Sequence, residues 1–449
     1  MVRGPQRYTQ SRSSAASDVY KRKEYGYRKT FNLGAQITHE FDNGWRLVSN
    51  TGVTKFDWSY SNLSVGAVTG SDVARTQLLQ DEDVTSYATD MRLEGEAYTG
   101  NVLHNLTFGF DVSRFKETAS SIFYYGQDTI DYTNPDYAPI TSVQDGTTWS
   151  ADKNVTVEQV GIYIGDELEF GNWRAGLALR HDQNKAEGQS ETLYVIPGSG
   201  SYPGSTNLTR DDSATTGQAS LGYVWDNGVS AYMSYGTSFK SFAEPGDTGA
   251  ALDPTTGEQW EVGAKYLPAT IDAYLSASLY QLDEKNRAVY VQNGAGVRVY
   301  DQVGKSRVRG LELEGRANFV NGWSLTGGYS YTDSEIIGGD NNGNELGLTP
   351  KNTFKLWASK EIQNGPLAGL TVGAGARYIG ERYAFNANSN ALSSVTLLDA
   401  AVSYDFGNGS ELQLNVTNLT DEAYVSSVGY FSTYYGDGRT VSATFSTQW

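Results

Sequence analysis

The residues that could do chemistry in this sequence are few and scattered. The chain has no cysteine, which excludes disulfides, thiolate zinc sites and thiol nucleophiles. Its three histidines, His39, His104 and His181, lie far apart, and no Gly-x-Ser-x-Gly motif accompanies them. A serine hydrolase needs a Ser–His pair oriented by a third group. We therefore expect a protein that is not an enzyme, with histidines that are ordinary strand or turn residues.

One loop offers oxygen ligands for a cation. The run Asp340-Asn-Asn-Gly-Asn-Glu345 places carboxylate and amide oxygens close together, as calcium requires. Its glycine does not stand where an EF-hand loop needs it, so a solvated loop tip is the preferred interpretation. We expect no resident metal ion and no cofactor.

Aromatic residues cluster in two polar segments, 122–150 and 425–439. Rings on polar loops provide a large contact area at low entropic cost, as in other recognition surfaces. The alternative is that the rings pack the loops together or belong to a membrane-interface girdle. The candidate ligand-binding residues are Tyr124, Tyr125, Tyr132, Tyr137 and Trp149 in the first segment, beside Phe123, and Tyr430, Phe431, Tyr434 and Tyr435 in the second.

Charge and hydropathy exclude several classes of protein. The 449 residues carry a formal net charge of −18, which argues against a nucleic-acid partner because phosphate binding needs Lys and Arg. No apolar run approaches the length of a membrane-spanning helix. The first residues, Met1 to Arg7, contain no apolar region, so we expect no export signal in this chain.

The elements that must position the candidate residues are β-strands. Between Leu311 and Phe319, apolar or small residues alternate with Glu312, Glu314, Arg316 and Asn318. A period of two sends successive side chains to opposite faces of a strand. Charged groups and glycines on one face, with Leu, Val, Ala and rings on the other, are typical of a strand between a polar lumen and lipid.

The connections between strands favour a transmembrane barrel over a soluble sandwich. Every second connection is a tight turn such as Asp42-Asn43-Gly44 or Asn321-Gly322, and long polar segments lie between them. Four of those segments, 120–154, 182–211, 240–257 and 333–349, are expected to be external loops. We expect seventeen strands, beginning near Arg28, Gly44, Asp81, Val102, Val155, Trp173, Asp212, Val229, Glu258, Thr270, Tyr300, Trp323, Leu348, Ala368, Ser393, Ser410 and Arg439.

The parity of the turns also predicts that the chain is truncated at its N-terminus. If Trp449 ends on the periplasmic side, the first strand runs inward, and an outward strand before it is missing. Bacterial single-chain barrels have an even number of strands. We therefore expect residues 28–449 to form a partial barrel, and residues 1–27 to be the remnant of an extracellular loop.

The C-terminal half resembles a known family of barrels. Ser306-Arg-Val-Arg-Gly-Leu-Glu-Leu-Glu-Gly315, Gly328-Tyr-Ser-Tyr-Thr-Asp333 and Leu414-Asn-Val-Thr-Asn-Leu-Thr-Asp-Glu-Ala-Tyr424 are similar to segments of TonB-dependent outer-membrane receptors. The stretch Thr256-Gly-Glu-Gln-Trp-Glu-Val-Gly263 points to the ferric-siderophore subfamily. Each motif alone is weak, but their order and spacing from about Ser234 to Trp449 are specific.

The resemblance implies an architecture and a set of partners. The family has 22 strands around a lumen that a plug domain fills, so five strands and the plug would be absent here. It implies capture of a ferric siderophore, with iron only as part of that ligand, and coupling to the TonB complex through the missing plug. It also implies a monomer embedded in the lipid of the Gram-negative outer membrane. The assembly machinery there would recognise the last strand at Val441, Ala443, Phe445 and Trp449.

Three alternatives remain open at this point. A barrel without a plug could be a passive, porin-like channel, which would show a large steady conductance in planar bilayers. It could also be a fragment that forms no closed barrel and has no function. A soluble all-β binding or adhesive protein is the third, and it fails if the chain needs detergent to stay dispersed.

Overall fold

The fold was examined in a computed structural model that describes residues 25–125, 129–135, 147–242, 252–292, 298–428 and 433–448. Regular structure in these residues is entirely β-strand. Within the same ranges, no helix has the length and apolar character needed to cross a membrane. The expectation of an all-β protein is confirmed.

The strands are long and joined mostly by short connections. Their bounds are β1 (Tyr25–Glu40), β2 (Arg46–Thr69), β3 (Asp72–Thr99), β4 (Val102–Tyr124), β5 (Thr129–Asp131), β6 (Thr148–Phe170), β7 (Trp173–Ile196), β8 (Gly200–Val224), β9 (Val229–Lys240), β10 (Thr255–Tyr266), β11 (Asp272–Gln292), β12 (Arg298–Asn318), β13 (Trp323–Ile337), β14 (Asn352–Glu361), β15 (Leu370–Ile379), β16 (Arg382–Tyr383), β17 (Ala391–Leu392), β18 (Val395–Asp405), β19 (Ser410–Thr417), β20 (Val425–Val428), β21 (Thr433–Tyr435) and β22 (Thr440–Thr447).

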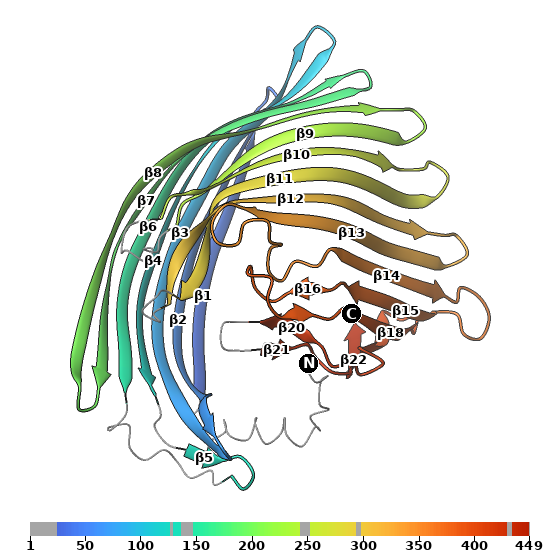
Figure 1. Ribbon diagram of the computed structural model, residues 1–449. Helices are drawn as coiled ribbons and strands as arrows, with labels where there is room; N and C mark the ends of the chain where they lie inside the picture. The colour runs from blue at the N-terminus through green and yellow to red at the C-terminus, as the bar shows by residue number, and fades with distance from the viewer. Residues whose placement is uncertain are drawn as a thin grey trace.

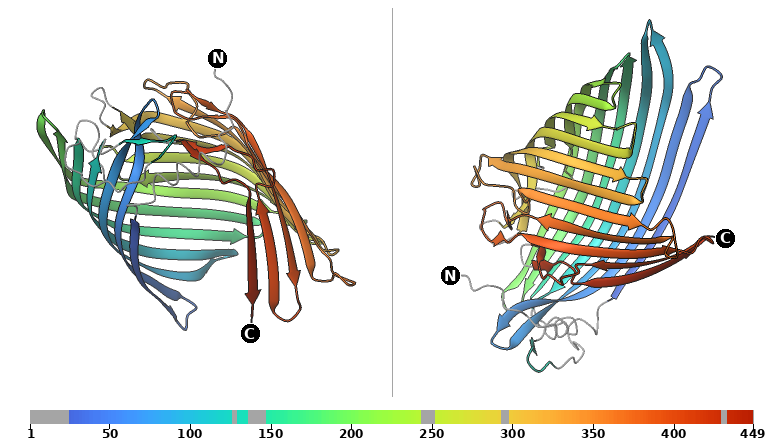
Figure 2. Two further views of the ribbon diagram at one scale, coloured as in Figure 1. Left: turned by 90° about the horizontal axis from the view of Figure 1, so that it is seen from below. Right: turned by 90° about the vertical axis from the view of Figure 1, so that its right-hand side faces the viewer.

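One antiparallel sheet forms a curved wall around a hollow interior (Figure 1). Eighteen of the described strands belong to it, one more than the seventeen predicted. The additional strand is the three-residue β5, which pairs with the first residues of β3. Each other strand pairs with its neighbours in chain order, and β19 pairs with β22. The wall does not close, since the described pairings leave one edge of β1 and one edge of β22 free. Figure 2 shows the gap between them.

Tight turns at one end of the wall, here called the turn end, follow the predicted turn chemistry. Gly44 and Gly322 adopt φ values of 81° and 85°, in the left-handed region that residues with a side chain rarely occupy. In each turn the glycine N–H donates to a carbonyl three residues earlier, Phe41 and Phe319 respectively. These glycines therefore set the register of the two hairpins that they close.

The opposite end of the wall, here called the loop end, differs from the prediction because several strands extend further than expected. β3 begins at Asp72 and not near Asp81, and β13 continues to Ile337, into the predicted loop 333–349. Residues 182–211 are not an external loop, because β7 continues to Ile196, β8 begins at Gly200, and a tight turn joins them. Residues 120–154 are likewise partly strand, since β4 reaches Tyr124 and β6 begins at Thr148. Most positions on both faces of these extensions are polar, so the alternation that marks the lower strands does not reveal them.

The two faces of the wall differ in side-chain packing. Leu177 and Leu179 on β7 are 58% and 59% exposed, as are similar apolar side chains at alternate positions of the neighbouring strands. Further along β7, Arg180 and Asp182 occupy the alternate positions and point to the other face, where their side chains are 30% and 8% exposed. Side chains converge on the concave face of a curved sheet and spread apart on its convex face. The concave face is therefore the polar lumen, and the convex face is the apolar exterior.

The long connections at the loop end are held to each other by hydrogen bonds. The Asn388 side chain accepts from the Glu345 N–H at 2.8 Å and donates to the Glu345 carbonyl at 2.8 Å. Arg382 donates to the Val425 carbonyl at 2.7 Å, which ties β16 to β20. Burial lowers the pKa of this arginine. The connections after β13, β15 and β19 thus form one packed cluster.

Candidate functional site

A row of aromatic rings crosses four strands on the lumen face at the loop end. Phe123 of β4 lies opposite Trp149 of β6, which lies opposite Tyr194 of β7, which in turn lies opposite Tyr202 of β8. The first pair makes a T-shaped contact with ring centroids 5.5 Å apart. Phe123 lies an even number of residues from Asp111 on β4, and Trp149 lies an even number from Tyr163 on β6, so these rings share the lumen face with Asp111 and Tyr163. Tyr194 is likewise on the same face of β7 as Arg180, and Tyr202 is its register partner on β8. All four rings therefore face the lumen. These four residues are called the ring row below.

A second set of rings runs up the lumen face of β2 toward the ring row. Trp58 lies between Phe56 and Tyr60, with centroid distances of 6.5 and 5.1 Å. The Arg28 guanidinium of β1 sits 5.1 Å from the Trp58 ring centre, in a cation–π arrangement. Asn62 is the next lumen-facing residue of β2 after Tyr60, in the direction of the loop end. It pairs with Leu78 of β3, which in turn pairs with Phe123 of β4. The two sets of rings are therefore linked on the lumen face through Asn62 and Leu78.

The ring row lies well beyond the part of the wall that could cross a bilayer. A tilted strand spans the hydrocarbon core with roughly 9–11 residues. β4 has 23 residues, and Phe123 is its last but one, counted from the turn end. The rings accordingly line the mouth of the lumen at the loop end.

Charged groups at the mouth are few and mostly paired with each other. Lys153 lies 3.3 Å from Glu117, with both side chains largely covered. Partial burial raises the pKa of Glu82, the register partner of Trp58, and repulsion from Glu117 adds to the effect. The mouth thus presents rings with little net charge of either sign.

Below the ring row, a continuous chain of ionic contacts follows the lumen wall across β2, β3, β4, β6 and β7. Arg180 is its centre, because the guanidinium bonds Asp111 of β4 at 2.5 Å and Asp182 of its own strand at 2.6 Å. The strand between them contributes Gly161, and a Cβ there would overlap the guanidinium. This charge belt consists of Arg46, Glu94, Arg92, Asp90, Tyr163, Asp111, Arg180, Asp182 and Gln159.

A tyrosine joins the two halves of the charge belt. The Tyr163 hydroxyl of β6 donates to Asp90 of β3 at 2.5 Å, and its ring lies 5.7 Å below the Arg180 guanidinium. To reach β3 the ring crosses β4 directly over Gly109, where a Cβ would overlap it. Glycine at these lumen positions therefore lets long side chains bridge non-adjacent strands. The result is a flat polar wall in which three arginines pair with four carboxylates.

The predicted ring residues fall into three groups. Trp149 is in the ring row, and Tyr125 stacks on Phe123 with centroids 6.1 Å apart. Tyr124 occupies the alternate position on β4 and so belongs to the outer face. Tyr132, Tyr434 and Tyr435 are exposed near β5 and on β21, away from the ring row. The remaining three, Tyr137, Tyr430 and Phe431, lie outside the described residues.

Several site residues escaped the sequence analysis. Trp58, Tyr194 and Tyr202 lie in strands that were predicted as membrane wall or as loop, and Arg28 stood at the edge of the first strand. The i, i+2 spacing of Phe56, Trp58 and Tyr60 was a usable signal, because alternate positions share one face. Tyr194 and Tyr202 could not be found locally, since only the β7–β8 register brings them together.

The other chemical candidates keep structural roles. His104 bonds Asp166 at 2.8 Å and His181 bonds Thr215 at 2.9 Å, on separate strands of the wall. Glu345, the acidic end of the loop at 340–345, pairs with Lys351 at 2.6 Å and thereby raises the pKa of that lysine. Within the residues that the structure describes, no cluster of three His, Asp or Glu side chains is placed to hold a metal ion.

Comparison with known proteins identifies the family. Residues 3–419 match the family described as TonB dependent receptor-like, beta-barrel, and the chain belongs to it. It is 32% identical to the ferrioxamine receptor of Yersinia enterocolitica, covering 95% of this chain and 59% of that protein. It is 31% identical to the ferrichrome outer membrane transporter/phage receptor of Escherichia coli K12, covering 84% of this chain and 50% of that protein.

The solved structures agree on the fold. The closed form of the ferric-catecholate import receptor Fiu from Escherichia coli K12 superposes with a TM-score of 0.78 over 94% of this chain and 64% of that one. The sequence identity is 21%, so this likeness concerns the fold alone. The chain spans about half to three fifths of the length of the two curated relatives named above. The predicted membership of the TonB-dependent receptor family is confirmed.

Proposed function

We propose that this chain is the greater part of the barrel wall of an outer-membrane receptor that binds a ferric siderophore and passes it to the periplasm. Two kinds of support combine: membership of the TonB-dependent receptor family and the names of the relatives, which include receptors for ferrioxamine and ferrichrome. The single observation that carries the proposal is the ring row at the mouth of a polar lumen. Iron enters only as part of the cargo, and no resident cofactor takes part.

The proposed receptor is a closed monomeric barrel of 22 strands in the Gram-negative outer membrane. Its further strands would pair with the free edges of β1 and β22, since exposed edges inside lipid leave backbone groups unbonded at a cost of several kcal/mol each. A plug domain would fill the lumen against the charge belt and couple to the TonB complex. The outer-membrane assembly machinery would recognise the last strand.

The chemistry of the mouth favours a neutral or weakly charged chelate. Rings of the ring row and of Tyr125 can pack on the apolar and carbonyl-rich surface of such a ligand, and tyrosine hydroxyls can bond its rim. Lys153 is already paired with Glu117, and Arg28 lies over Trp58, so strong attraction for an anion is not provided. Ferrioxamine B and ferrichrome fit this description better than a strongly anionic ferric catecholate does.

Binding of radiolabelled ferrioxamine B and ferrichrome to the full-length receptor on cells tests the proposal. We expect Trp149→Ala and Tyr194→Ala each to weaken binding of one of these ligands by about 1 kcal/mol or more, as loss of a ring anchor does. Tyr124→Ala is the matched control, because that ring is on the outer face. Unchanged affinity for all these chelates in both lumen-facing variants would overturn the assignment of the site.

A further inference from the structure

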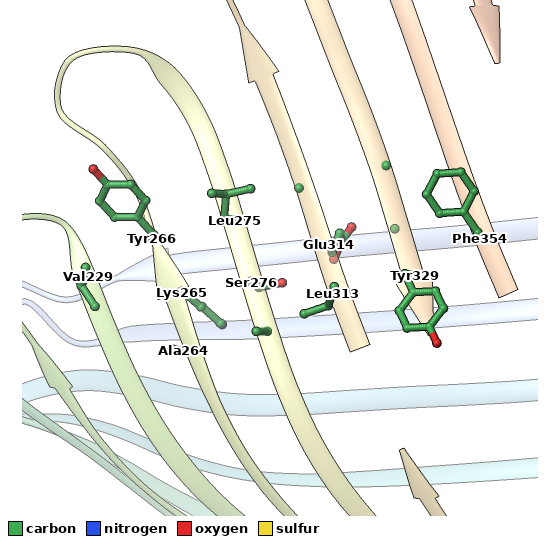
Figure 3. Close-up of a pocket in the computed structure, with 14 residues that line it drawn as sticks. Val229, Ala264, Lys265, Tyr266, Leu275, Ser276, Leu313, Glu314, Tyr329 and Phe354 are labelled. Carbon is green, nitrogen blue, oxygen red and sulfur yellow. The ribbon is translucent and has the colours of Figure 1, made fainter. Parts of the chain in front are cut away.

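A groove runs along the outer face of the wall where β10 to β14 approach the turn end (Figure 3). It encloses about 540 Å³ and is lined almost entirely by apolar atoms. Tyr266, Leu275, Leu313 and Phe354 form its sides, one from each of β10, β11, β12 and β14. Its volume is within the range of roughly 300–1,000 Å³ that small-molecule sites occupy.

The floor of the groove is made by residues without bulk. Gly315 of β12 faces Gly327 of β13 directly, and Leu275 leans across Gly315, where a Cβ would come within 2.6 Å of it. Toward the turn end, Ala317 and Ala358 flank Leu325. Leu325 also lines a second hollow of about 220 Å³, with Phe319, Asn321 and Trp323. Both hollows follow β13 from Trp323 to Tyr329, and this path is about 20 Å long, at roughly 3.3 Å per residue.

A single cation stands at the lower end of this path. Lys360 of β14 is the register partner of Trp323, and its ammonium lies 5.9 Å from the centre of that ring. It donates to the Asn321 carbonyl, and an ammonium carries three N–H groups, so two remain. No other charged residue occupies an outward position on this part of β11 to β14, all of which the structure describes. The part meant here runs from the turn end to Leu279 on β11, Leu311 on β12, Tyr329 on β13 and Phe354 on β14.

We propose that this groove binds an anionic phospholipid of the periplasmic leaflet, with one acyl chain in the groove and the phosphate at Lys360. The inference rests on the proposed membrane location of the wall. Tryptophan and lysine are the residues that mark a membrane interface, and basic pockets there select anionic headgroups. Because the chain as a whole carries a charge of −18, general attraction cannot supply this selectivity, and Lys360 must.

Native mass spectrometry of the full-length receptor in detergent micelles measures the lipid retained. The probes are phosphatidylglycerol and phosphatidylcholine with identical acyl chains. We expect phosphatidylglycerol to be retained about fivefold better, and Lys360→Gln to abolish that preference. Lys185→Gln, at an exposed lysine near the loop end, is the matched control and should retain it.

A second pair of variants tests the groove itself. Ala264→Phe fills the groove from β10 and should reduce retention of both lipids, whereas Ala374→Phe, at an equally exposed outward alanine of β15, should not. Equal retention of the two lipids by the wild-type receptor would overturn the proposal. So would a preference for phosphatidylglycerol that survives Lys360→Gln.

Brominated lipids separate failure of this inference from failure of the membrane location. In vesicles that contain the full-length receptor, brominated phosphatidylglycerol should quench the fluorescence of Trp323 more than brominated phosphatidylcholine does. The Trp323 signal is measured as the difference between the wild-type receptor and Trp323→Phe. Equal quenching of Trp323 by both lipids would contradict the phospholipid site alone. Absence of quenching at every tryptophan would contradict the proposed membrane location, and the site with it.

Discussion

Tyr163 reaches Asp90 only because the strand between them carries a glycine. The ring crosses β4 over Gly109, and Arg180 crosses β6 over Gly161 in the same way. In a sheet, neighbouring strands are about 4.8 Å apart, so a side chain that bridges two such steps must lie flat on the strand it crosses. Gly109 and Gly161 are therefore explained by contact between side chains of non-adjacent strands.

Replacing Gly109 by alanine tests this explanation. The added Cβ would displace the Tyr163 ring, break its bond to Asp90 and leave a carboxylate oxygen without that donor. We expect Gly109→Ala to lower the free energy of unfolding by roughly 1–3 kcal/mol, measured by urea titration of the full-length receptor in micelles. The control is Gly52→Ala, a lumen position on β2 where a Cβ meets nothing within 4 Å. Equal effects of the two substitutions would contradict the explanation.

The last strand carries a prediction at the scale of single elements. Val441 and Phe445 alternate outward on β22 and are 67% and 64% exposed, as a strand facing lipid requires. Trp449 continues the same alternation in the sequence. In a full-length, signal-bearing receptor, Phe445→Ser or deletion of Trp449 should lower the amount of assembled barrel severalfold, because this strand is proposed as the assembly signal.

Heat-modifiable mobility on gels reports the assembled fraction. Thr444→Ser, at the neighbouring inward position of β22, is the control and should assemble normally. Normal assembly of the Phe445 and Trp449 variants would contradict the proposed role of these residues.

Strand positions were predictable at one end of the wall and not at the other. The predicted starts at Val102, Trp173 and Val229 coincide with the observed ones, because tight turns of Gly, Asn and Asp mark them. The start expected at Asp212 is in fact at Gly200. Beyond the bilayer both faces of a strand contact water or polar groups, so no alternation distinguishes an extended hairpin from a loop.

The candidate site was predictable only as far as local sequence reaches. Tyr125 and Trp149 were recognised because several rings lie within a few residues of each other. Tyr194 and Tyr202 join them only through the pairing of β7 with β8, and Trp58 only through the pairing of β2 with β3. Register is a property of the assembled sheet, and the segments that carry these rings have no turn signal to fix it.

At the scale of the whole molecule, the open wall makes its own prediction. β1 and β22 each present a free edge, and long unpaired edges recruit other strands. We expect the chain by itself to aggregate when refolded into detergent, as light scattering and sedimentation would detect. A monodisperse, protease-resistant particle would show instead that β1 and β22 can pair in a new register.

This chain contains no cysteine, so single cysteines introduced into it can be labelled without background from its own residues. Thr192 and Glu191 are neighbours on β7, the first facing the lumen beside the ring row and the second facing outward. In the full-length receptor on intact cells, we would label Thr192→Cys and Glu191→Cys with a membrane-impermeant maleimide, with and without ferrioxamine B or ferrichrome. The account predicts that both positions are labelled, and that the bound chelate slows labelling at Thr192→Cys alone. Equal labelling rates with and without either chelate at Thr192→Cys, in a receptor that binds the chelate, would contradict it.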